Sequence, residues 1–498
     1  MEEIISSAPP CHSDQKGYNL QRISKDVIPP WGRRSDVPPL RSVLSLAIML
    51  ACPAAIVFWY VTLQHFDGSL LLAIVALRNE GFISFFREYC PVPTPQTALV
   101  YGAWVLFQAL LYSFLPGSTH EGQPTPAGNV LKYKINGLLA SVVTVLLFSA
   151  ISLWGGNFAS SFVAANWGEF LAIFNIYGFF LTLAFYLKAH ISPSHLEDRK
   201  FSGSPLYDIY MGIELNPRLG QSWDIKLFHN GRPGIIGWIL IDISFTALQF
   251  CRHGYITNSI LIADVLHLTY IVDFFFNEDW YLKTMDMAHD HVGFYLAWGS
   301  AAWLPTIYTL QPQFLAVHPI SLSPLTAAMI LTAGFGGYIL FRSANHQKYL
   351  VRDTQGKCLV WGKAPEYIHG EYKTTDGSTH KSIILCSGML NTLTSPLLNL
   401  PLIIIVNLAL NRPLRILFVT GWWGVVRHAN YLGDLILSYA MCATCGFTHL
   451  LPWTYAIFMT TILVHRCYRD EQRCAKKYGK TWEEYCGKVR WRIIPGIF

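Results

Sequence analysis

The chain has 498 residues, of which 52% are hydrophobic and 14% charged, with a mean hydropathy of +0.32 and a formal net charge of +6. This composition leaves too little polar surface for a soluble globule of ordinary composition. The sequence therefore predicts an integral membrane protein.

The first 41 residues are polar and rich in proline, and they contain no long apolar run. Such a segment predicts a disordered cytosolic tail rather than a cleaved signal peptide. The first apolar helix, which begins near Ser42, would then serve as the signal anchor.

Six stretches without Asp, Glu, Lys or Arg are each near or above the roughly 20 residues that cross a hydrocarbon core. They are residues 42–64, 97–119, 135–168, 170–187, 294–317 and 319–341. Further candidates are residues 235–250, 255–276 and 435–464, the last with a turn signal at residues 446–452. We expect an all-α, polytopic integral membrane helix bundle with about ten transmembrane helices.

Ionisable groups gather in and just after the apolar segment that ends near residue 276. At helical spacing, Tyr270, Asp273 and Asn277 share a face, and Glu278 follows at once. Ionisable groups inside a membrane are functional by default. The alternative is that Asp273 and Glu278 pair structurally with basic residues elsewhere in the chain.

Metal and disulfide sites are not predicted. The eleven cysteines have no regular spacing and several lie in apolar stretches, which favours buried free thiols. Cys442 and Cys445 form a CxxC pair, but in an apolar run we interpret it as packing. His289 and His291 point to different sides of a helix, so no metal site is expected there.

The chain ends in a basic region. From His465 onward, nine Lys or Arg residues face four Asp or Glu residues. By the positive-inside tendency this region is cytosolic, at a membrane surface and facing something anionic.

Two long motifs carry a family resemblance. They are GSPLYDIYMGIELNPR at residues 203–218 and LVHRCYRDEQRCAKKYG at residues 463–479. With further matches at residues 123–128, 134–137, 226–234, 274–283, 344–348 and 495–498, the chain after about residue 40 resembles the sterol reductase family. Within it, the likeness is greater to the enzymes that act on the Δ7 bond than to the Δ14-sterol reductases or the lamin B receptor.

The resemblance implies a multi-pass enzyme of the endoplasmic reticulum membrane. It would use NADPH to reduce the Δ7 double bond of 5,7-diene sterols in cholesterol biosynthesis, by hydride transfer and protonation. The alternatives are a Δ14-sterol reductase or a catalytically inactive sterol-binding scaffold. We expect the sterol to come from the bilayer, an association with other sterol-biosynthesis enzymes, and no nucleic-acid partner.

The resemblance also assigns a nucleotide site to the C-terminal half, about residues 294–498. The expected NADPH contacts are Lys348, Arg352, Leu385, Trp423, Asn430, Tyr431, Asp470, Cys474, Ala475, Lys476, Lys477, Tyr478 and Tyr485. Cationic side chains suit phosphates, and Trp423 offers a stacking face. No GxGxxG motif follows a strand, so a Rossmann domain is not expected.

The proton donor is expected in the ionisable cluster. Protonating an alkene carbon needs an acid placed in a dry cavity. Tyr270 is the predicted donor, with Asp273 or Glu278 orienting it or resupplying its proton. In the first motif, Glu214, Asn216 and Arg218 either bind sterol or brace a cytosolic loop.

One segment departs from the family pattern. Relatives run from a Ser-Gly pair almost directly into Trp-Gly-Val, whereas residues 389–420 intervene here as an apolar stretch between Leu385 and Trp423. We interpret this segment as a gene-model artefact or a lineage-specific insertion. If it is an artefact, its deletion should restore NADPH-dependent activity.

Overall fold

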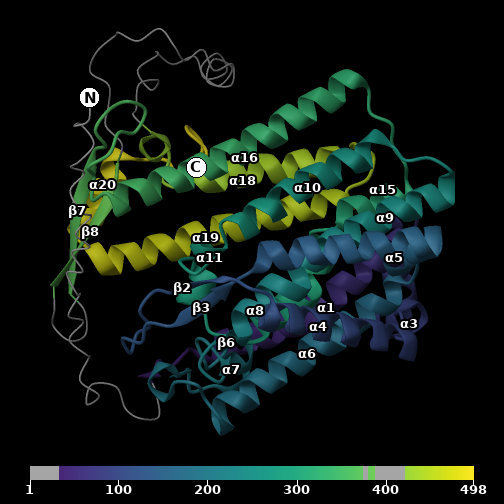
Figure 1. The fold of residues 1–498 in the computed structure, drawn as a ribbon, viewed down its shortest axis with the longest axis horizontal. Coiled ribbons are helices and arrows are strands. Elements are labelled where there is room, and N and C mark those ends of the chain that lie inside the picture. Colours follow the sequence, from purple (N-terminus) through teal and green to yellow (C-terminus); the bar gives the residue numbers. More distant parts are fainter. Residues whose placement is uncertain (1–32, 374–378, 387–420) are drawn as a thin grey trace, which may run out of the picture.

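The protein forms an elongated bundle of long helices (Figure 1). The computed structural model describes residues 33–373, 379–386 and 421–498. Residues 1–32 of the predicted tail and the atypical segment 389–420 therefore lie outside the described residues. At one end of the bundle, β7, β8 and α20 gather beside the ends of α16 and α19.

Helices dominate the described chain. Their bounds are α1 (Pro39–His65), α2 (Leu70–Glu80), α3 (Phe82–Tyr89), α4 (Pro95–Phe114), α5 (Gly137–Ala165), α6 (Trp167–Ile191), α7 (Pro205–Met211), α8 (Ile225–Gly231), α9 (Gly237–His253), α10 (Asn258–Phe276), α11 (Glu278–Tyr281), α12 (Met285–Ala288), α13 (Phe294–Trp298), α14 (Leu304–Ile307), α15 (Leu310–Val317), α16 (Pro324–Asp353), α18 (Ala429–Ala443), α19 (Thr454–Tyr478) and α20 (Lys480–Lys488). Short 3₁₀ turns are η1 (Leu196–Asp198), η4 (Trp422–Gly424) and η5 (Leu451–Trp453), and π-helical turns are η2 (Arg232–Ile236) and η3 (Gly299–Trp303).

Strands occur only in pairs within the described residues. The parallel pair joins β1 (Arg33–Arg34) to β4 (Lys200–Phe201). The antiparallel pairs are β2 (Ser118–Glu121) with β3 (Lys132–Ile135), β5 (Arg218–Leu219) with β6 (Trp223–Asp224), and β7 (Tyr367–Lys373) with β8 (Thr379–Leu385). No doubly wound sheet is present in this part of the chain, as a Rossmann domain would require.

Seven helices of the described chain are long and apolar enough to cross a membrane. They are Pro39–His65, Pro95–Phe114, Gly137–Asn157, Trp167–Ile191, Ile225–His253, Asn258–Phe276 and Pro324–Asp353. Many large apolar side chains on them are exposed, as expected where lipid replaces water as the solvent. The predicted all-α polytopic membrane fold is confirmed.

One predicted span takes a different form, and another forms a helical hairpin. Residues 294–317 are not one helix but α13, η3, α14 and α15 in succession. Pro305 and Pro312 within this stretch cannot donate the backbone hydrogen bonds of a continuous helix. Residues 435–464 form the predicted hairpin, in which α18 turns through residues 444–453 into α19.

Helices α16 and α18 lie side by side and touch backbone to backbone (Figure 1). A Cβ added at Gly337 would lie 2.7 Å from the carbonyl oxygen of Gly433, and one added at Gly433 would lie 2.6 Å from that of Gly337. Glycine at both positions therefore permits a helix separation that no other residue allows. This contact fixes the relative position of the two helices that lead into the C-terminal site.

Candidate functional site

The predicted nucleotide-binding residues gather at the end of the bundle where α16, β8, η4, α18 and α19 meet. Leu385 and Trp423 belong to one buried apolar cluster, together with Ala344, Val351 and Ala429. The backbone on both sides of the atypical segment is anchored. The Cys386 N–H donates to the Glu366 carbonyl at 2.9 Å, and the Trp422 N–H donates to Gln347 Oε1 at 3.0 Å.

Lys348 and Trp423 form the centre of this region. The Lys348 ammonium lies 4.6 Å from the Trp423 ring centroid, and the indole N–H donates to the Ala344 carbonyl at 2.7 Å. Lys348 also interacts electrostatically with Arg352 and Asp470. No carboxylate of the described residues forms an ion pair with Lys348, and Asp470 pairs instead with Arg473 at 2.6 Å. Positive charge on α16 thus remains available for an anion.

Unmatched polar atoms line the start of α18. The Oδ1 atom of Asn430, the Nε2 atom of His428 and the indole nitrogen of Trp422 are buried and have no hydrogen-bond partner among the described residues. The His428 ring stacks on Tyr431 with centroids 4.9 Å apart. Burial lowers the pKa of His428 to about 4, so the imidazole is neutral at physiological pH. Unmatched donors and acceptors beside a cation and stacked rings suit a nucleotide.

A salt-bridge network holds η4 and α18 against α19. The guanidinium of Arg427 donates to the carbonyls of Val489 and Arg490 at 2.7 and 2.8 Å and to Glu471 at 2.6 Å. Arg492 completes the network with Glu471 at 2.9 Å. Burial acts against ionisation of Glu471, but hydrogen bonds from Arg492 and Arg427 outweigh it and lower the pKa of this carboxyl.

The remaining predicted contacts lie on α19 and α20. Cys474, Tyr478 and Tyr485 pack in an apolar cluster with Cys386, whereas Ala475, Lys476 and Lys477 are exposed on the outer face of α19. The structure therefore brings Lys348, Arg352, Leu385, Trp423, Asn430, Tyr431 and Asp470 to one region. It leaves Ala475, Lys476 and Lys477 on the exposed side of α19, away from the apolar cluster that contains Cys386.

Tyr270 lies in an aromatic group at the centre of the bundle. Its ring lies 6.0 Å from that of Trp238 and 6.3 Å from that of Phe341. Trp238 in turn packs on Tyr308 at 5.3 Å. Asp434, one turn after Tyr431 on α18, interacts electrostatically with both Tyr270 and Tyr308.

Sequence reasoning gave Asp434 no role. Its signal was present, because Asp434 is a carboxyl group followed by a long apolar run. Arg466 on α19 was likewise read only as part of the basic region. It pairs with Asp286 at 3.2 Å and interacts with Asp434, so the Tyr270 group and the C-terminal half are electrostatically connected.

Asp273 and Glu278 are both held by basic residues. Arg342 forms a close ion pair with Asp273, and the Tyr338 hydroxyl donates to the same carboxylate at 2.9 Å. Glu278 pairs with Arg232 at 2.6 Å with both side chains fully buried, and it also accepts the Gly137 N–H at 2.8 Å. Neither carboxylate is hydrogen-bonded to Tyr270 among the contacts of the described residues, although Asp273 interacts with it electrostatically.

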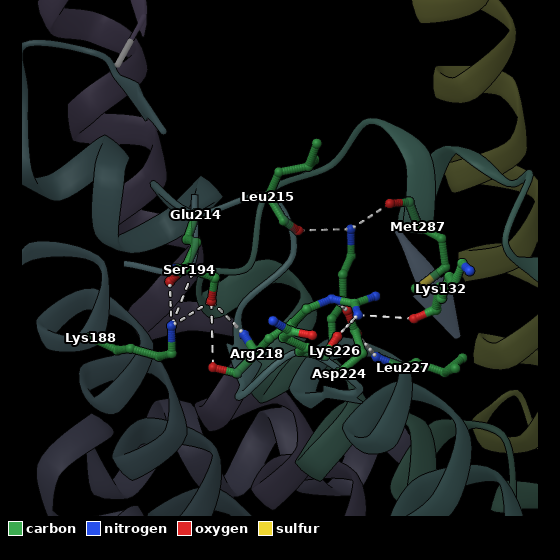
Figure 2. Close-up of polar contacts among 11 residues, drawn as sticks. Lys132, Lys188, Ser194, Glu214, Leu215, Arg218, Asp224, Lys226, Leu227 and Met287 are labelled. Atoms are coloured by element: carbon green, nitrogen blue, oxygen red, sulfur yellow. Dashed lines mark hydrogen bonds and ion pairs between the residues drawn. The ribbon is translucent and has the colours of Figure 1, made fainter. Parts of the chain in front are cut away.

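Figure 2 shows that the first motif forms a polar network around Arg218 and Lys226. Glu214 accepts from Lys188 at 3.0 Å and from the Ser194 N–H at 2.6 Å. Arg218 pairs with Asp224 at 3.2 Å and donates to the Lys132 carbonyl at 2.9 Å. Glu214 and Arg218 therefore both brace the loop.

The same network reaches the segment before α13. The buried Lys226 ammonium donates to the carbonyls of Leu215 and Met287 at 3.2 and 3.0 Å (Figure 2). It also donates to the Asp290 carbonyl at 2.6 Å. Asp290 pairs through its side chain with Arg469 on α19 at 3.2 Å. The loop of the first motif thus supports the segment that contacts the C-terminal basic helix.

Comparison with known proteins gives consistent matches over nearly the whole chain. The model of the "Ergosterol biosynthesis ERG4/ERG24 family" matches residues 42–498. A 7-dehydrocholesterol reductase of Danio rerio is 40% identical over 483 residues, which cover 94% of this chain and 94% of that protein. A 7-dehydrocholesterol reductase of Arabidopsis thaliana is 34% identical over 461 residues, covering 92% and 98%. A Delta(14)-sterol reductase of Methylotuvimicrobium alcaliphilum is 32% identical over 454 residues, covering 91% and 94%.

Proposed function

The chain belongs to the ERG4/ERG24 family of sterol reductases, and from this premise we propose that it reduces the Δ7 double bond of 5,7-diene sterols with NADPH. It is a membrane-embedded oxidoreductase of sterol biosynthesis. The proposal concerns its bond specificity, its cofactor, its site residues and its placement in the endoplasmic reticulum membrane.

The choice of NADPH rests on the charge around Lys348. A 2′-phosphate and a pyrophosphate together need several cationic donors, and Lys348 and Arg352 lie one turn apart on α16. Unmatched Asn430 Oδ1 suits an amide N–H of the cofactor, and the stacked rings of His428 and Tyr431 suit a planar group. When bound, NADPH supplies the hydride.

The proton is assigned to Tyr270. The nucleotide region and Tyr270 are joined by α18, on which Tyr431 and Asp434 are one turn apart. A phenol in an aromatic, largely water-free group can protonate a substrate carbon if a nearby group later returns its proton. Asp434 takes the second role better than Asp273 or Glu278, because those two are already held by Arg342 and Arg232.

Sequence identity to the relatives favours the Δ7 bond over the Δ14 bond as the one that is reduced. The relative named for 7-dehydrocholesterol in Danio rerio is 40% identical, and the bacterial relative named for the Δ14 bond is 32% identical. The single observation that carries the proposal is the connection from Lys348 and Trp423 through α18 to Tyr270. A Δ14-reductase would share this connection and differ only in how the sterol is seated. An inactive scaffold would have no need for unpaired cations at this end of α16.

The test is product analysis. Microsomes that contain the full-length chain and no other sterol reductase would receive a 5,7-diene sterol or an 8,14-diene sterol, with NADPH or NADH. We expect NADPH-dependent loss of the Δ7 bond by mass spectrometry. Reduction of the 8,14-diene alone would reassign the bond, and no product from either sterol would favour the scaffold.

A further inference from the structure

A cavity of about 140 Å³ lies where α5, α9 and α10 meet, apart from the Tyr270 group. Its apolar wall is formed by Val145, Ile239, Ile243, Leu268 and Ile271. Ile243 and Leu268 are 36% and 46% exposed, and all three helices are candidate membrane spans. Exposed apolar side chains on such helices face lipid, so the cavity lies at the boundary with the bilayer.

Two carboxyl groups line the same cavity, and each uses only one of its oxygens. Asp242 Oδ2 lies 3.0 Å from His267 Nδ1, and the Thr246 hydroxyl donates to Asp264 Oδ2 at 2.6 Å. The Oδ1 atoms of both aspartates are buried and have no hydrogen-bond partner in the part of the chain that the structure describes, and Asp242 is only 4% exposed. A buried polar atom left unmatched costs about 1 to 3 kcal/mol, so this pair of oxygens suits a ligand.

The charge around the pair decides what that ligand is. His267 is the basic residue that contacts Asp242, and no Lys or Arg of the described chain forms an ion pair with either aspartate. The two carboxyl groups also interact with each other. In a low-dielectric site two such neighbours do not both ionise, so at least one of them retains a proton.

The partners indicate which oxygens carry a proton. Trp238 donates its indole N–H to His267 Nδ1 at 3.2 Å, so this ring nitrogen is an acceptor. The 3.0 Å contact between Nδ1 and Asp242 Oδ2 then places a proton on Asp242 Oδ2, which leaves Asp242 Oδ1 as an acceptor. Asp264 accepts the Thr246 hydroxyl through Oδ2 and forms no ion pair with a Lys or Arg of the described chain, so burial favours a proton on its Oδ1 atom. The cavity then presents one acceptor at Asp242 and one donor at Asp264.

We propose that this cavity binds the hydroxyl group of a membrane-borne alcohol, whose hydrocarbon body lies against the apolar wall and the adjoining lipid. A hydroxyl is the group that donates one hydrogen bond and accepts another. A metal ion fits poorly, because no cluster of three or more metal-binding side chains occurs among the residues that the structure describes. The ring centroid of Trp238 lies 5.0 Å from that of His267 and 6.0 Å from that of Tyr270. The alcohol site therefore adjoins the proposed catalytic group without being part of it.

Photolabelling of the full-length chain in lipid nanodiscs tests this site. The probes are a diazirine-bearing cholesterol with a free 3-hydroxyl and a diazirine-bearing hexadecanol, each compared with its methyl ether. We expect the free alcohols to label residues 239–243 and 264–271, and the ethers to label them about tenfold less, since they cannot donate to Asp242. Labelling by the sterol alone would identify a sterol site, and labelling by both would identify a general lipid-alcohol site.

Two variants act on the site in different ways. Asp264→Leu keeps the shape of the side chain but removes the donor, and Ile243→Trp fills the cavity while keeping both carboxyl groups. Each should reduce labelling of these peptides about tenfold, whereas Thr269→Val, a polar-to-apolar exchange on α10 outside the cavity, should leave it unchanged.

Equal labelling by alcohols and ethers would overturn the proposal and assign the cavity to water. Unchanged labelling in both cavity variants would also overturn it. The experiment contains no NADPH and measures no turnover, so its failure is distinguishable from a failure of the proposed reductase activity.

Discussion

The Lys348 ammonium lies 4.6 Å from the centroid of the Trp423 ring, across a sequence separation that includes the atypical segment. The indole holds the cation at the end of α16 without neutralising it. An anion that binds here therefore meets a cation already fixed in place.

Loss of this cation should weaken NADPH binding. Lys348→Ala and Arg352→Ala each remove a proposed charge-assisted contact with a phosphate. Such a contact contributes about 1.5 to 3 kcal/mol to the binding free energy, so the KM for NADPH should rise by about tenfold or more. The preference of the enzyme for NADPH over NADH should become smaller. Lys357→Ala, an exposed lysine just after α16, is the matched control. Unchanged NADPH kinetics in both variants would refute the assignment.

Tyr270→Phe should separate binding from chemistry. The ring still packs against Trp238, but the transferable proton is gone, so sterol reduction should slow by about 100-fold or more while NADPH affinity is retained. Tyr255→Phe, at an exposed tyrosine between α9 and α10, is the control. Near-normal turnover would move the acid role to another group, with Glu278 and His289 tested next.

The fully buried pair of Arg232 and Glu278 distinguishes a structural role from a catalytic one. Glu278→Gln leaves the guanidinium without its countercharge, which should destabilise the fold by about 3 to 5 kcal/mol and lower the apparent Tm. The double variant Arg232→Met with Glu278→Leu should recover most of the stability. If the recovered protein is active, Glu278 is structural, and if it folds but is inactive, Glu278 takes part in proton supply.

Because His428 is buried and neutral, we expect the folded protein to lose stability in mild acid. Burial lowers its pKa from 6.5 to about 4, so below pH 6.5 the unfolded chain binds a proton that the folded chain does not. The contribution of neutral His428 to the free energy of unfolding is complete above pH 6.5. It falls by roughly 3 kcal/mol as the pH drops to about 4. The apparent Tm of the solubilised protein should decline over this range, and less steeply in His428→Gln. His465→Gln, at an exposed histidine, should follow the wild type.

Deletion of residues 389–421, which joins Gly388 to Trp422, tests the atypical segment. Leu385 and Trp423 share one buried cluster in the full-length chain, and a long loop between neighbouring ends costs little closure entropy. We therefore expect full-length protein and deletion variant to bind NADPH with similar affinity, measured by fluorescence titration. Binding by the deletion variant alone would support the artefact interpretation, and transcript sequencing across this region would settle its origin.

The bundle was predictable because apolar length reports membrane spans directly. Most helix ends lie within five residues of the predicted bounds, as for residues 42–64 and helix α1 (Pro39–His65). The broken path through residues 294–317 was not predicted, since hydropathy measures composition rather than backbone direction. Pro305 and Pro312 were the available signal.

The candidate site was predictable in residue type but not in pairing. Charge and hydroxyl content marked the region from Tyr270 to Glu278 and the basic end of the chain. Which carboxylate faces Arg342 and which faces Arg232 depends on helices far apart in sequence, so no local pattern contains that information. Asp434 had a local signal as a carboxyl group before an apolar run, but its partners Tyr270 and Tyr308 come from other segments, so its role could not be assigned from sequence.

The glycine contact between α16 and α18 has a kinetic consequence. Since Gly337 and Gly433 lock the two helices together, Lys348 on one and Asn430 on the other cannot separate by sliding. We therefore expect that the proposed NADPH docks onto a finished surface, at a rate governed by diffusion and by the attraction between phosphate and the basic end of the chain. On this proposal the slow steps of turnover would be those of the sterol, which has to leave the bilayer and return to it.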